Sequence, residues 1–161
     1  METLVLQNKN RETIKVFSWI LIVISTIGLL SSLFVSNGYS SMITMQSITK
    51  NFEPPVGINF ALYFVQNAVG IILCVVVFVS AAFVLKYNNR WRKVLVYELI
   101  VSTIFLMISP IINYYNIDNI IVGVNKIQRL IGYYFLSISL SAFFITVIIK
   151  LSKEEVKLLF K

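Results

Sequence analysis

The chain of 161 residues has no histidine, a single cysteine and few charged residues. Without histidine it lacks the commonest general base and the commonest metal ligand of proteins. Neither a Ser–His pair nor an HExxH motif is therefore possible. The lone cysteine, Cys74, excludes an internal disulfide and a CxxC redox pair. We predict no catalytic residues, no metal and no cofactor, and we do not expect an enzyme.

Charged residues make up 13% of the chain, whereas 58% of its residues are hydrophobic. This composition departs from that of soluble domains and indicates one membrane domain over residues 1–161. Four apolar runs are long enough to cross a hydrocarbon core about 30 Å thick at about 1.5 Å per residue. They cover residues 16–35, 59–85, 92–112 and 127–150. The sequence predicts an all-α integral membrane four-helix bundle with antiparallel, up-down helices.

The net charge of +7 is explained by basic residues that flank the apolar runs. No basic patch is interleaved with stacking aromatic residues, so nucleic acid is not an expected partner. Eleven of the fourteen basic residues lie in the N-terminal tail, in the 86–93 turn and from Lys150 to the C-terminus. The positive-inside rule then predicts a multi-pass protein of the cell (cytoplasmic or inner) membrane, with both termini cytoplasmic. Membrane lipids are its expected surroundings. Within the turn, four residues are predicted to lie at the membrane surface: Arg90, Trp91, Arg92 and Lys93.

A few polar residues interrupt the apolar runs. Glu98 shares one face of the third predicted helix with Ser102 and Ser109, at 100° per residue. We expect this face to point into the bundle, where a hydroxyl of a neighbouring helix can donate to the carboxyl group. Gln66 and Asn67 lie toward the opposite end of the second helix and are not expected to meet Glu98. Glu98 is either a proton or cation site or a hydrogen-bonded acid that fixes helix packing, and Gln66 and Asn67 either line an outer cavity or bridge helices.

Small residues recur along the first and fourth runs. Because they allow helices to approach closely, they are predicted to pack helices together. In the first run they are Ser18, Ser25, Gly28 and Ser32, and in the fourth they are Ser137 and Ser141.

The segments outside the runs have their own patterns. The connection 36–59 is predicted to hold a short amphipathic helix in the first outer loop, ended by Pro54 and Pro55. Asn10 is suited to cap the first helix. The tail 152–161 is expected to continue the fourth helix out of the bilayer, as a solvated end or a docking segment.

Three functions are compatible with this sequence. The favoured one is a non-catalytic subunit or interaction (scaffold) protein within the bilayer, whose partner is a second copy or another membrane subunit. The alternative is an ion channel, pore or small transporter with a polar path around Glu98. The third is a lipid-modifying enzyme, which would require a pocket with convergent polar residues.

Overall fold

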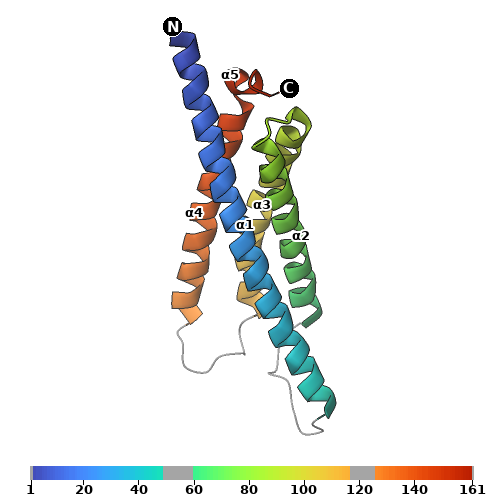
Figure 1. Ribbon diagram of the computed structural model, residues 1–161. Helices are drawn as coiled ribbons and strands as arrows, with labels where there is room; N and C mark the ends of the chain where they lie inside the picture. Colours follow the sequence, from blue (N-terminus) through green and yellow to red (C-terminus); the bar gives the residue numbers. More distant parts are fainter. Residues whose placement is uncertain (1, 49–59, 117–125, 161) are drawn as a thin grey trace.

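A computed structural model of the protein describes residues 2–48, 60–116 and 126–160, which form four long helices and one short helix. The helices are α1 (Glu2–Ile48), α2 (Phe60–Val84), α3 (Asn89–Asn116), α4 (Lys126–Ser152) and α5 (Glu154–Lys157). The four long helices are each long and apolar enough to cross a membrane. The prediction of an all-helical chain with four long apolar helices is therefore confirmed. These helices alternate in direction along the bundle, which brings both ends of the chain to one end of it (Figure 1).

Each long helix packs along the next one in the sequence: α1 along α2, α2 along α3, and α3 along α4. The turn between α2 and α3 is short because Tyr87 takes a left-handed backbone conformation, with φ of 55°. Asn88 then caps α3, since its side-chain oxygen accepts hydrogen bonds from the backbone N–H groups of Arg90 and Trp91 at 3.0 and 3.3 Å. This turn sets α2 and α3 side by side as a hairpin.

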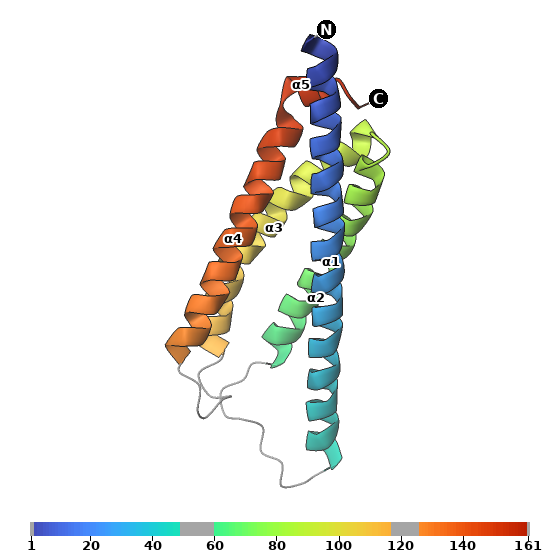
Figure 2. The same ribbon diagram turned by 60° about the vertical axis from the view of Figure 1, so that its left-hand side comes forward.

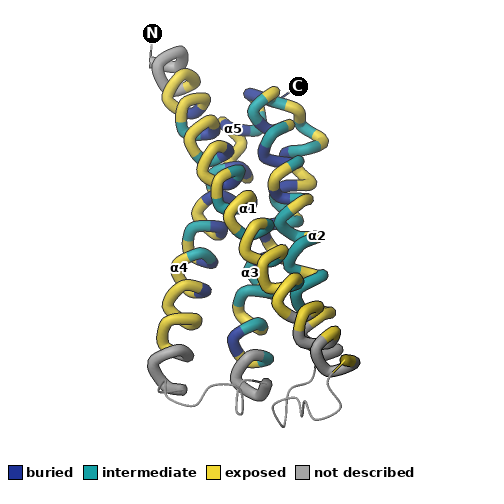
Figure 3. The backbone as a smooth tube through the Cα atoms, turned by 60° about the horizontal axis from the view of Figure 1, so that its bottom comes forward, coloured by how far each residue is buried: buried dark blue, intermediate teal, exposed yellow. Residues whose placement is uncertain are grey.

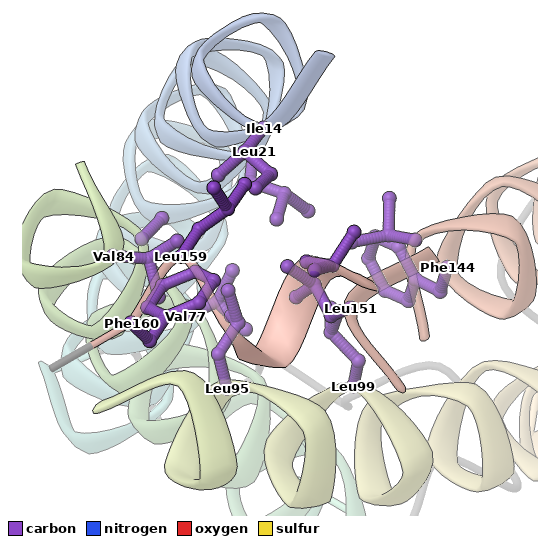
Figure 4. Close-up of a cluster of buried hydrophobic side chains, with 13 residues drawn as sticks. Ile14, Leu21, Val77, Val84, Leu95, Leu99, Phe144, Leu151, Leu159 and Phe160 are labelled. Carbon is purple, nitrogen blue, oxygen red and sulfur yellow. The ribbon is translucent and has the colours of Figure 1, made fainter. Parts of the chain in front are cut away.

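The hydrophobic core is concentrated at the end of the bundle that holds both chain ends, which we call the closed end (Figures 3 and 4). Ile14 and Leu21 of α1 meet Leu95 and Leu99 of α3 and Leu151 of α4 in this core, and all five are fully buried. At the opposite end, the open end, α1 and α4 diverge (Figure 2). Every residue of α4 from 131 to 136 is exposed there. Helices α1 and α4 are therefore close at one end of the bundle and separated at the other.

Contact between α1 and α4 lies near the closed end. Lys150 Nζ donates a hydrogen bond of 2.8 Å to Asn10 Oδ1. The rings of Phe17 and Phe143 meet edge to face, with centroids 6.0 Å apart. Among the described residues, α1 and α4 have little further contact. Asn10 is only 3% exposed and lies eight residues inside α1, so the prediction that it caps a helix is wrong.

The first connection differs from the prediction of a separate amphipathic helix. Helix α1 continues unbroken through residues 36–48, and it ends at Ile48. These residues contain no proline and one glycine, Gly38, so the sequence has no strong signal to end the helix after the apolar run. The rest of the connection, with Pro54 and Pro55, lies outside the described residues.

The C-terminal tail does not extend α4 away from the bundle. The backbone at Lys153 is extended, which ends α4 and lets α5 turn back. Val156, Leu159 and Phe160 then form one apolar side that is buried at the closed end. The ring of Phe160 lies 5.8 Å from that of Tyr87. The expectation that the tail continues α4 as one helix is wrong, because burial of these three side chains holds the tail against the core.

Candidate functional site

A cavity of about 400 Å³ lies between the four long helices. It lies next to the core, on the side toward the open end. Ile24 of α1, Leu73 of α2, Phe105 of α3 and Leu140 of α4 are among its lining residues, and its surface is almost entirely apolar. Its volume falls within the range of about 300–1,000 Å³ that is typical of small-molecule sites.

Three serines line the cavity, and two of them are buried and donate hydrogen bonds within their own helices. Ser25 Oγ donates to the backbone oxygen of Leu21 at 2.6 Å, and Ser102 Oγ donates to Glu98 Oε1 at 3.4 Å. The surface of the cavity is nevertheless almost entirely apolar.

The cavity opens sideways between α1 and α4. Ile27 of α1 and Leu136 of α4 both line it, yet they are 59% and 58% exposed. Ser31, also in the lining, is exposed as well. Since α1 and α4 diverge here, the opening faces the surroundings of the bundle and not its closed end (Figure 2).

Glu98 lies one helical turn from the cavity, on the side of the closed end. It is half-buried, and its hydrogen bond comes from Ser102 of its own helix, whereas we expected a donor from a neighbouring helix. The i,i+4 spacing explains this, because such residues are neighbours on a helix surface. Within the described ranges, no lysine or arginine nitrogen lies within 4.0 Å of its carboxylate.

The two amides of α2 connect helices near the open end. Gln66 Nε2 donates to Ser109 Oγ of α3 at 2.5 Å. Asn67 Nδ2 donates to the backbone oxygen of Ser32 at 3.0 Å and to Ser36 Oγ at 2.6 Å, both in α1. Ser109 thus pairs with Gln66 and not with Glu98, and the polar candidates divide into two separate groups. Apolar side chains of the cavity lie between these groups, so the described residues do not form a continuous polar path.

The predicted packing residues lie inside the bundle. Ser18, Ser25, Ser137 and Ser141 are buried, and Gly28 and Ser32 are half-buried. At Gly28 the approach is very close, because a Cβ atom there would lie 2.7 Å from Cys74 Sγ of α2. Small residues therefore let α1 and α2 come together at this point.

A second stripe of small residues on α4 was missed in the sequence. Gly132, Ser139, Ala142 and Thr146, which we call the α4 stripe, are all exposed. With Phe135 and Ile149 they alternate at spacings of three and four residues, the pattern of a helix-packing seam. The same spacing is readable in the sequence, but Ser137 and Ser141 offered an equally good pattern. Only the rotation of α4 about its axis shows that Ser137 and Ser141 are buried whereas the α4 stripe is exposed.

The four residues predicted to lie at the membrane surface occupy different environments. Arg90 and Lys93 are exposed, and Trp91 stacks on Phe83 with ring centroids 4.7 Å apart. Arg92 is only 6% exposed, so its side chain is buried within the protein. Its Nη1 donates to the backbone oxygen of Leu151 at 2.9 Å, and its guanidinium lies 5.7 Å from the ring centre of Phe160. Arg92 therefore joins α3 to the end of α4 and to the C-terminal tail.

No protein-family model, curated protein or solved structure matches this chain. The class of protein is therefore described by its own fold: an all-helical chain, over the described residues, with four helices long and apolar enough to cross a membrane and an apolar cavity between them.

Proposed function

We propose that this protein is a non-catalytic membrane subunit that associates with another transmembrane helix through the α4 stripe. The observation that carries the proposal is the exposure of four small residues on one face of α4. Between Val94 and Ile111 of α3, by contrast, every exposed residue is large, and the same holds for the exposed residues of α2. Lipid requires no small side chains, whereas a second helix can approach closely only where side chains are small.

The spacing of the stripe favours a helix as the partner. Positions that alternate by three and four residues remain on one side when two helices cross at about 20°, the commonest crossing angle in membrane bundles. Thr146 Oγ1 donates to the backbone oxygen of Ala142 at 2.8 Å. Its hydroxyl is therefore satisfied within α4, and close packing does not require a polar group from the partner.

A non-catalytic role is supported by the use of the polar side chains inside the fold. Gln66 and Asn67 bridge helices, and the hydroxyl of Ser102 is bonded to Glu98. An enzyme that modifies lipids would require polar groups that converge on a pocket. The cavity instead has an apolar surface.

A second copy of the chain is the partner to test first. Two copies inserted in the same direction can pair their α4 helices about a two-fold axis, so that each stripe meets itself. The test uses Ser139→Cys in a Cys74→Ser background, with Ile138→Cys as the matched control. Ile138 is its neighbour and is 55% exposed, but it lies outside the stripe. We expect oxidation in membranes to give a disulfide-linked dimer with cysteine at position 139 and none with cysteine at 138.

If no dimer forms, a photoreactive maleimide on the same cysteine identifies a different subunit. A discrete protein adduct from position 139 but not from 138 would support association with that subunit. Adducts with lipid alone at both positions would refute association through the α4 stripe.

We also propose the cytoplasmic membrane as the location, with both termini in the cytoplasm. The support is the basic residues at the closed end, which include Arg11, Lys15, Arg90 and Lys153. A Lys153→Cys variant in the Cys74→Ser background tests the orientation. We expect a membrane-impermeant maleimide to label inside-out vesicles and not intact cells. Labelling of intact cells would show that the C-terminal end lies outside the cell and would contradict the proposed orientation.

A further inference from the structure

We propose that the cavity between the four helices holds one hydrocarbon chain of a membrane lipid, which enters sideways between α1 and α4. This site is separate from the α4 stripe. Leu140, in the cavity wall, follows Ser139 of the stripe and therefore lies about 100° further round the helix. Lipid in the cavity and a partner helix on the stripe thus contact different residues on adjoining faces of α4, which border each other where Leu136 lies one turn from Gly132.

The depth and chemistry of the cavity suit hydrocarbon. All its lining residues belong to the four helix segments able to cross a membrane. A buried water needs two to four polar partners, but almost none of the cavity surface is polar, and Ser31 of the lining is exposed. The apolar wall therefore favours an apolar occupant over water.

The length of the cavity suits a short stretch of hydrocarbon. Along α1 it extends from Ile24 to Ser31, which corresponds to about 10 Å at 1.5 Å per residue. A hydrocarbon chain, which is much thinner than a helix, can enter a cavity of about 400 Å³ over that length.

The position of the opening indicates which molecule can enter the cavity. Ile27 and Leu136 are exposed at the mouth, so the cavity is continuous with the surrounding bilayer. Toward the closed end, Val77 and Phe144 line the cavity and also belong to the buried core (Figure 4). An unfilled space would deprive these side chains of dispersion contacts. Lipid acyl chains surround the spanning segments of a membrane protein. One acyl chain inside the cavity restores the dispersion contacts of its lining side chains.

The experiment uses the full chain in nanodiscs of phosphatidylcholine that carries a photoreactive diazirine in its acyl chain. Adducts are mapped by mass spectrometry at Leu140, inside the cavity, and at Ile104, which is exposed on α3 and serves as the internal reference. The test variant is Gly70→Val, because Gly70 lines the cavity and a Cβ atom there would be 4.0 Å from its nearest neighbour, Phe105. The matched control is Gly38→Val, where a Cβ atom meets nothing within 4 Å.

We expect Leu140 adducts in the wild type and in the Gly38→Val control, and their loss in Gly70→Val with Ile104 adducts unchanged. Ser31→Trp narrows the mouth at an exposed position and should give the same loss even if Gly70→Val does not fold. Leu140 adducts that persist in both variants would overturn the proposal, as would their absence from the wild type. The Ser139→Cys dimer is measured separately, so failure of one proposal is distinguishable from failure of the other.

Discussion

The close approach of α1 and α2 at Gly28 predicts a substitution whose effect on stability changes sign. A Cβ atom at Gly28 would lie 2.7 Å from Cys74 Sγ, nearer than packed atoms allow. Overpacking of this kind costs about 1–3 kcal/mol. Replacement of glycine by alanine inside a helix contributes about 1 kcal/mol in the opposite direction. We therefore expect Gly28→Ala to lower the free energy of unfolding by about 1 kcal/mol.

Removal of the sulfur atom should reverse the sign. Cys74 Sγ is the sole atom within 4 Å of that Cβ position, apart from the local helix backbone. In a Cys74→Ala background the methyl group added at position 28 has space. The higher helix propensity of alanine is then the only effect of Gly28→Ala on stability. Gly28→Ala should then raise the free energy of unfolding by up to about 1 kcal/mol. The coupling between the two positions should be about 1–3 kcal/mol.

The assay is reversible unfolding of the four proteins of this double-mutant cycle in mixed detergent micelles, followed by circular dichroism. Gly38→Ala is the control, because a Cβ atom there meets nothing within 4 Å and the residue is exposed on the same helix. Equal stabilisation by Gly28→Ala and Gly38→Ala would refute the close contact. A coupling near zero would show that α1 and α2 do not meet at Cys74.

Three further substitutions test the polar contacts. Asn67→Ala removes two hydrogen bonds from α2 to α1 and should lower stability by about 0.6–1.7 kcal/mol in the same unfolding assay, since intramembrane hydrogen bonds contribute that much. Arg92→Lys loses the planar guanidinium that bonds Leu151 and lies over Phe160, so hydrogen exchange should accelerate across residues 153–160, and unchanged protection there would contradict its role. Glu98→Gln retains a side-chain acceptor for Ser102 at a bond already 3.4 Å long, and we expect a stability change below about 1 kcal/mol. A larger loss on unfolding would reveal a structural role for the charge.

The bundle architecture was largely predictable because it depends on local properties of the chain. The length and apolar content of a run decide whether it can cross a bilayer as a helix. Even so, the sequence predicted a separate short helix within residues 36–59, whereas α1 continues to Ile48. A change from apolar to polar composition marks where a helix leaves the apolar layer, but it does not end the helix.

The candidate site was much less predictable. Ser137 and Ser139 are two residues apart and similar in sequence context, but Ser137 is buried against the bundle and Ser139 is exposed. Arg90 and Arg92 differ in the same way, since Arg90 is exposed and Arg92 bonds the end of α4. Which face of a helix points inward depends on rotation about its axis, and neighbouring helices set that rotation.

The sequence by itself determined that the chain has four long apolar helices without histidine or a cysteine pair, because hydropathy and composition can be read residue by residue. The tertiary structure decided that α1 and α4 meet at the closed end through Lys150 and Asn10 and diverge beyond it. It also decided that an apolar cavity lies where they diverge. These features arise from the angles between helices, which depend on side chains far apart in the chain.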